Sequence, residues 1–109
     1  MSVGLFRFNG DIDDDKSSIV FSLNISSEKF YQKFWIKAIL DTDIKLFKDG
    51  SKFTPEQVDI VINELYRLIK WCNNNLSGND NFKMNSTLKE LIKSIPEEAI
   101  KSNEPFYIF

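Results

Sequence analysis

The densest group of residues capable of chemistry is an acidic run near the start of the chain. Asp11, Asp13, Asp14 and Asp15 stand together, and three of them have the alternate spacing that opens a calcium-binding loop. The rest of such a loop is missing, because the sixth position is Lys16 where glycine is required and the twelfth is not glutamate. We expect no metal site and no cofactor. The run is either a solvated loop tip or an anionic surface for a basic partner.

The groups that ordinary catalysis needs are scarce. The chain has no histidine, which removes the commonest general base, the commonest metal ligand and every Ser-His or Cys-His nucleophile. Cys72 falls on an apolar helical stripe, where a cysteine behaves as a small hydrophobic residue. The four glycines are too widely separated to form a phosphate-binding loop. We therefore expect a protein that binds and not an enzyme.

Lysines recur every four residues at Lys29, Lys33 and Lys37, which places them along one edge of a helix. Together with the many aromatic residues they invite a nucleic-acid-binding interpretation. The formal net charge of −2 and the presence of only two arginines argue against it. We expect a solvated helix edge and no direct contact with nucleic acid.

Length and composition predict one globular domain over residues 1–109. Hydrophobic residues make up 42% of the chain and aromatic residues 14%, enough apolar surface to form a core. A single cysteine cannot form an internal disulfide, and no signal-peptide pattern or membrane-spanning run of about 20 apolar residues is present. These features predict a cytoplasmic protein with no membrane partner.

The ends of the chain have strand patterns. Residues 3–8 and 18–24 are short apolar runs with partial alternation, joined by a polar loop, which predicts a β-hairpin. Residues 105–109 are too apolar for a free tail, and we expect them to form a third strand that docks on the hairpin.

The middle of the chain has helical periodicity. A helix is predicted from residue 28 to about 40, capped by Ser26 or Ser27. Thr54, Pro55 and Gln57 form the start signal of a second helix, whose apolar stripe ends at Cys72. Asn73 to Asn75 and residues 77–81 are expected to form the polar loop after it. A third helix is expected to begin near Asp80 or Asn85 and to end at Pro96.

This order of elements predicts an α+β fold, in which a small antiparallel sheet, made of the N-terminal hairpin and the C-terminal strand, packs against about three helices. Trp35, Leu65 and Ile69 are expected in the core because they lie on the apolar stripes of the first two helices.

Three runs and the chain's last residues resemble small immunity proteins of bacterial contact-dependent growth inhibition and related polymorphic-toxin systems. The runs are FYQKFWIKAI at 30–39, FKDGSKFTPEQ at 47–57 and ELYRLIKW at 64–71, and the sequence closes on YIF at 107–109. The resemblance implies a cytoplasmic protein that protects its producer by binding the C-terminal toxin domain of an effector, often a nuclease. It implies tight stoichiometric binding that blocks the toxin's active site.

On this interpretation the partner is a basic toxin domain, and the contact residues are Asp11, Asp13, Asp14 and Asp15, because a local acidic patch suits the cationic cleft of a nuclease. The chain itself is expected to be a monomer or a weak oligomer. The alternative is a non-enzymatic adaptor or structural domain that presents an exposed aromatic patch to a protein partner.

Overall fold

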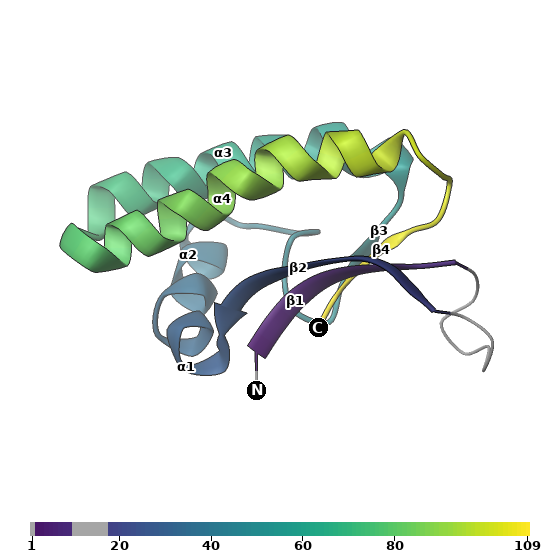
Figure 1. Ribbon diagram of the computed structural model, residues 1–109. Coiled ribbons are helices and arrows are strands. Elements are labelled where there is room, and N and C mark those ends of the chain that lie inside the picture. The colour runs from purple at the N-terminus through teal and green to yellow at the C-terminus, as the bar shows by residue number, and fades with distance from the viewer. Residues whose placement is uncertain (1, 10–17) are drawn as a thin grey trace.

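A four-stranded antiparallel sheet carries helices over one of its faces in the computed structural model, which describes residues 2–9 and 18–109 (Figure 1). The strands are β1 (Ser2–Phe8), β2 (Ile19–Ser27), β3 (Lys52–Phe53) and β4 (Phe106–Ile108), in the order β2-β1-β4-β3. The predicted hairpin is β1 and β2, and the predicted C-terminal strand is β4, which pairs with β1. The α+β class is therefore confirmed. The short edge strand β3 was not expected from the sequence.

The first predicted helix is one continuous helical segment of three parts. It consists of α1 (Glu28–Phe30), a π-helical turn η1 (Tyr31–Trp35) and α2 (Ile36–Asp41). The backbone N–H of Phe30 donates to the Ser27 side chain at 3.3 Å, so Ser27 is the cap. The core-facing side of this helical segment carries Tyr31 and Trp35, whose rings stack with 6.2 Å between centroids.

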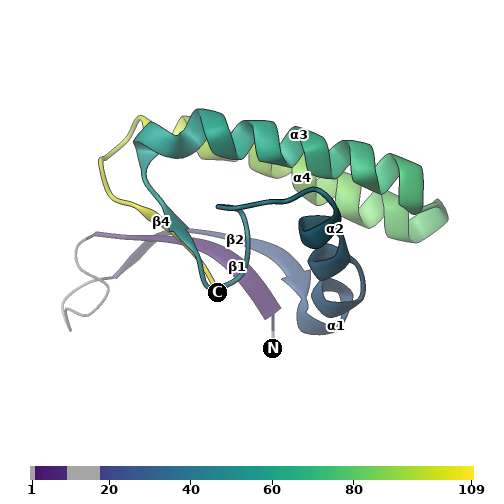
Figure 2. The same ribbon diagram turned by 180° about the vertical axis from the view of Figure 1, so that it is seen from behind.

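The second helix, α3 (Val58–Asn75), follows a 3₁₀ turn η2 (Pro55–Gln57). The backbone N–H of Thr54 donates to the Gln57 side chain at 2.9 Å, which is half of the predicted capping box. Helix α3 lies beside α4 (Gly78–Ala99), and both cross the same face of the sheet (Figure 2).

The third helix, α4, begins two residues before the predicted start at Asp80, and the predicted end at Pro96 was wrong. Because α3 extends through Asn75 and α4 starts at Gly78, the expected polar loop shrinks to two residues. Pro96 lies inside α4 and does not end it. The chain is held on both sides of the proline, since Ile95 is fully buried before it and the Glu98 carbonyl accepts a hydrogen bond from Arg7 after it. These tertiary contacts outweigh the loss of one helical N–H.

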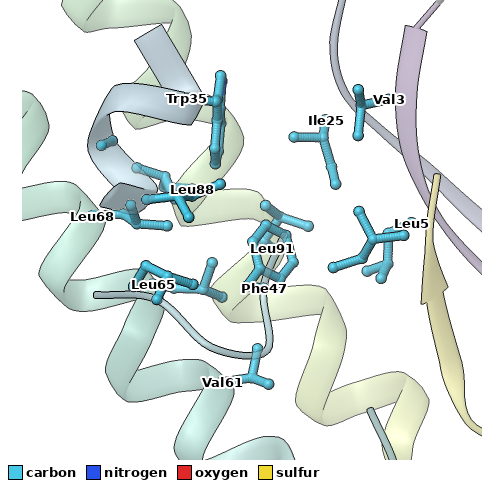
Figure 3. Close-up of a cluster of buried hydrophobic side chains, with 14 of the residues drawn as sticks. Val3, Leu5, Ile25, Trp35, Phe47, Val61, Leu65, Leu68, Leu88 and Leu91 are labelled. Atoms are coloured by element: carbon cyan, nitrogen blue, oxygen red, sulfur yellow. The ribbon is translucent and has the colours of Figure 1, made fainter. Parts of the chain in front are cut away.

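The core lies between the helices and the inner face of the sheet (Figure 3). Val3 and Leu5 of β1 point toward the helices, and Leu65, Leu68, Leu88 and Leu91 meet them from α3 and α4. Trp35 and Leu65 are buried as predicted. Ile69 is only partly buried and packs at the edge of the core, because Leu68 takes the central position.

Arg7 continues the inward-facing row of β1, although it is charged. Its guanidinium lies 4.4 Å from the centre of the Phe106 ring and donates to three backbone carbonyls at the end of α4 and just beyond it, those of Glu98, Ser102 and Glu104. Arg7 therefore ties the central strand to the end of α4, where helical carbonyls lack partners within the helix.

Candidate functional site

The described helices leave the outer face of the sheet uncovered (Figure 1). A group of aromatic side chains lies on this face. In β1, Val3, Leu5 and Arg7 point inward, so Phe6 and Phe8 point outward. Phe6 is paired with Tyr107 of β4, and Gly4 exchanges backbone hydrogen bonds with Phe109, so both C-terminal rings share this side. We call Phe6, Phe8, Tyr107 and Phe109 the aromatic face.

The four rings pack on one another across two strands. Phe6 stacks on Phe109 with 4.7 Å between ring centroids. Phe8 meets Tyr107 edge to face at 5.8 Å and lies nearly parallel to the Phe109 ring at 6.4 Å. Phe6, Phe8 and Tyr107 are half-buried, and Phe109 is 49% exposed. The rings are thus held in a fixed arrangement while one side of the group stays accessible to solvent.

Gly4 makes this arrangement possible. A Cβ atom at position 4 would lie 2.8 Å from two atoms of the Phe6 ring, closer than carbon atoms can approach. The ring therefore lies against the bare backbone of Gly4, two residues earlier on the same face of β1. Without a side chain at this position, Phe6 can turn toward Phe109.

The strand residues beside the aromatic face are mostly polar, and only one of them is charged. On the outer side, β2 contributes Ile19, Ser22 and Asn24, and β3 contributes Lys52, which is paired with Tyr107. Ile19 is 56% exposed. Lys52 is the single charged side chain that the described strands place on this side. An apolar centre surrounded by small polar groups is the arrangement of a protein-binding surface.

A small groove adjoins the aromatic face at Phe109. It has a volume of about 190 Å³, and its lining includes the apolar side chains of Ile36 and Phe109 and the acidic side chains of Glu28 and Asp49. Among the described residues, no lysine or arginine forms an ion pair with either acid. The groove, which we call the acidic groove, therefore combines an apolar wall with two acidic residues that form no ion pair within the described part of the chain.

Tyr31 connects the acidic groove to the core. Its hydroxyl accepts a hydrogen bond from the backbone N–H of Asp49 at 2.8 Å, and its ring stacks on Trp35. Burial raises the pKa of Tyr31, so the phenol stays neutral. Asp49 is in this way held against η1 by a side chain that is itself fixed in the core.

The predicted contact residues Asp11, Asp13, Asp14 and Asp15 lie outside the described residues. The described residues stop at Asn9, after β1, and resume at Ser18. The backbone N–H of Asn9 donates a hydrogen bond to the Ser18 carbonyl, and the backbone N–H of Ser18 donates one to the Asn9 side chain. Asp11 follows Phe8 of the aromatic face by three positions in the chain.

The lysine edge of the first helix is exposed, as expected: Lys29, Lys33 and Lys37 all face solvent. Lys37 lies 3.4 Å from Asp41, one turn later on the same helix. Exposed pairs of this kind contribute little to stability.

Cys72 is fully buried, and burial raises its pKa, which leaves the thiol protonated and unreactive. In the described part of the chain, no group of three or more Cys, Asp or Glu side chains is placed to hold a metal ion.

No family model, curated protein or solved structure matches this chain. The likeness to immunity proteins therefore stays a prediction. No helix in the described ranges is both long enough and apolar enough to cross a bilayer.

The burial of Glu64 was not predicted from the sequence. Glu64 is the one buried carboxylate among the described residues. Its oxygens accept the backbone N–H groups of Lys45, Leu46 and Phe47 at 2.8 to 3.3 Å. The helical periodicity of α3 indicates that position 64 is buried, because Glu64 follows Val61 by three positions and precedes Leu68 by four. Its role is to anchor the segment between α2 and β3 onto α3.

Proposed function

We propose that this chain is a cytoplasmic immunity protein, which binds a basic toxin domain through the aromatic face and blocks that toxin's active site. The observation that carries the proposal is the uncovered group of Phe6, Phe8, Tyr107 and Phe109. Clustered aromatic side chains are the typical centre of a protein interface, since they contribute a large contact area and lose little conformational freedom on binding.

The acidic groove supports a basic partner. A lysine or arginine side chain that entered it would place its aliphatic stem against Ile36 and Phe109 and its charge beside Glu28 and Asp49. A toxin that acts on nucleic acid needs such cationic side chains at its active site to bind phosphate groups. If this chain binds these cationic side chains of the toxin, they can no longer bind the phosphate groups of the toxin's substrate.

The acidic run Asp11, Asp13, Asp14 and Asp15 fits the same partner. Its place in the sequence, just after Phe8, makes it a neighbour of the aromatic face along the chain. Exposed acids of this kind act mainly by speeding the encounter with a basic protein. We therefore assign capture to the acidic run and the stability of the complex to the aromatic face.

The proposal is tested with the effector encoded in the neighbouring reading frame. Its C-terminal domain is titrated with the wild-type protein, with Phe8→Ser and with Phe109→Ser, and binding is measured by calorimetry. Truncation of an aromatic side chain at the centre of an interface costs about 2 kcal/mol or more, so each variant should bind roughly thirtyfold more weakly or worse.

Phe82→Ser is the matched control, because Phe82 is also an exposed phenylalanine, 70% accessible, but lies on α4 away from the aromatic face. It should bind like the wild type and protect cells that express the toxin domain. Equal loss of binding in Phe82→Ser would remove the aromatic face from the proposal. Failure of the wild-type protein to bind or protect would exclude the immunity function.

A second candidate function is supported by the same aromatic face. An adaptor domain would use it to hold a protein partner without blocking any activity. Gene context separates the two, because an immunity protein should be encoded directly beside a large secreted effector. Binding of single-stranded RNA by the same rings would contradict both candidates.

A further inference from the structure

The outer edge of β2 is the longest free strand edge in the described part of the chain. The strand has nine residues, Ile19–Ser27, and is paired only on the β1 side. Ser22 and Asn24 are exposed, and Ile19 and Val20 are each 56% exposed. A free edge of this length presents backbone N–H and C=O groups that can pair with another strand.

The hydrogen bonds of β1 show which residues present these groups. Gly4 exchanges both of its backbone bonds with Phe109, so its N–H and C=O point toward β4. Because successive residues of a strand alternate in direction, the groups of Leu5 point toward β2 and bond to Leu23, which is its partner in the register. The N–H and C=O groups of Ser22 and Asn24 therefore point away from the sheet.

The two edges of the sheet differ in their protection. The opposite edge strand, β3, has only two residues, and one of them is Lys52. Short length and a lysine are common means by which proteins prevent strand pairing at an edge. Strand β2 lacks both kinds of protection. It has nine residues, and its sequence, IVFSLNISS, contains no charged residue and no proline. Its register shifts, near Val20 and Ile25, leave the stretch 21–24 regular between them.

We infer that β2 pairs with β2 of a second copy of this chain, to form an antiparallel dimer with one continuous sheet. A twofold axis beside Ser22 would set Ser22 opposite its own copy, so that the two residues exchange N–H to C=O bonds. The same register sets Phe21 opposite Leu23 on the inner side, where both side chains are half-buried at the rim of the core. Identical residues meet at such an axis, and an uncharged strand brings no like charges together.

This inference is independent of the proposed function, because it concerns the protein without its toxin. The test is sedimentation velocity of the purified chain from micromolar to near-millimolar concentration. The wild type should pass from monomer to dimer, and Ser22→Ala should do the same because it keeps the backbone N–H. Ser22→Pro removes that N–H from both copies without breaking a bond to β1, and should weaken the dimer about tenfold or more.

Ser22→Lys provides a second variant that does not depend on how well proline is tolerated. It places two positive charges side by side at the axis and should shift the protein toward monomer, with partial recovery at high salt. Circular dichroism melts establish that each variant is folded. A wild-type protein that stays monomeric at every concentration would overturn the inference. So would a dimer that persists in folded Ser22→Pro or Ser22→Lys.

Discussion

Phe6 and Phe109 stack with 4.7 Å between ring centroids, although they stand at opposite ends of the chain. The contact joins β1 to the residue that follows β4, on the side of the sheet opposite to the helices. The hydrophobic core does not require it, because Leu5 and Ile108 already join the same strands on the inner side. A preformed aromatic group outside the core is therefore available for binding a partner.

Replacement of Glu64 should reveal its role as an anchor. In Glu64→Gln one carboxylate oxygen becomes an amide NH₂, which cannot accept the N–H groups that it faces. Loss of these charge-assisted bonds should lower the free energy of unfolding by about 1–3 kcal/mol. Urea denaturation measures the change.

Glu90→Gln makes the same chemical change at an exposed position of α4 and should alter the free energy of unfolding by less than about 0.5 kcal/mol. Equal effects of the two substitutions would show that the carboxylate of Glu64 is not the anchor.

Acid should weaken the contact between α2 and α3. The indole N–H of Trp71 donates to Asp41 at 2.8 Å, and this bond, with a smaller contribution from Lys37, lowers the pKa of Asp41 from its ordinary value of 3.8. A carboxyl group with a lowered pKa stabilises the fold above its unfolded-state pKa. That stabilisation is lost as the pH falls through the folded-state pKa.

The prediction is that Trp71→Phe, which keeps the aromatic ring but lacks the N–H, flattens the fall in stability below the ordinary pKa of 3.8. Urea melts of both proteins at neutral and acidic pH measure the difference. Parallel pH profiles would show that the bond between Trp71 and Asp41 does not contribute.

Cys72 should react slowly with a thiol reagent in the native protein and fast in denaturant. Its side chain is fully buried between α3 and α4, and burial raises its pKa. Asn63→Cys adds a second thiol at an exposed position of the same helix and should introduce one fast-reacting group. Rapid labelling of the wild type without unfolding would contradict the burial of Cys72.

Replacement of Asp11, Asp13, Asp14 and Asp15 by Asn should affect the rate of association with the toxin domain. If these acids act in capture, association should slow roughly tenfold at low ionic strength and depend less on salt, while dissociation changes little. Stopped-flow mixing at two salt concentrations measures both rates. An unchanged association rate would remove the acidic run from the interface.

Much of the fold could be predicted because local patterns and tertiary packing agree. The cap at Thr54 and Gln57 and the apolar stripe of α3 both depend on neighbours within one or two turns. Partial alternation likewise predicted the hairpin, and the apolar, aromatic composition of residues 105–109 predicted the C-terminal strand. Strand β3 has only two residues, too few for any alternation to be visible.

The predictions failed where a distant residue decides the outcome. Pro96 is a helix breaker by local rules, but burial of Ile95 and the bond from Arg7 to Glu98 keep α4 intact. The periodicity of α3 puts Glu64 on the buried side, but the N–H groups that make its burial possible belong to another segment, which the sequence of α3 does not reveal.

The aromatic face was foreseen only as a general exposed patch. Its members come from both ends of the chain and meet only through the pairing of β1 with β4. Their alternation with Leu5, Arg7 and Phe106 was visible, but the sequence did not show which side of the sheet the helices would cover.

On the proposed function, the toxin domain binds on the aromatic face. NMR chemical-shift mapping of the isotope-labelled protein, titrated with the unlabelled toxin domain, tests it most directly. We expect the largest shifts at Phe6, Phe8, Tyr107 and Phe109 and around the acidic groove, with little change on the exposed sides of α3 and α4. Shifts concentrated on α3 and α4, with those four residues unmoved, would contradict it.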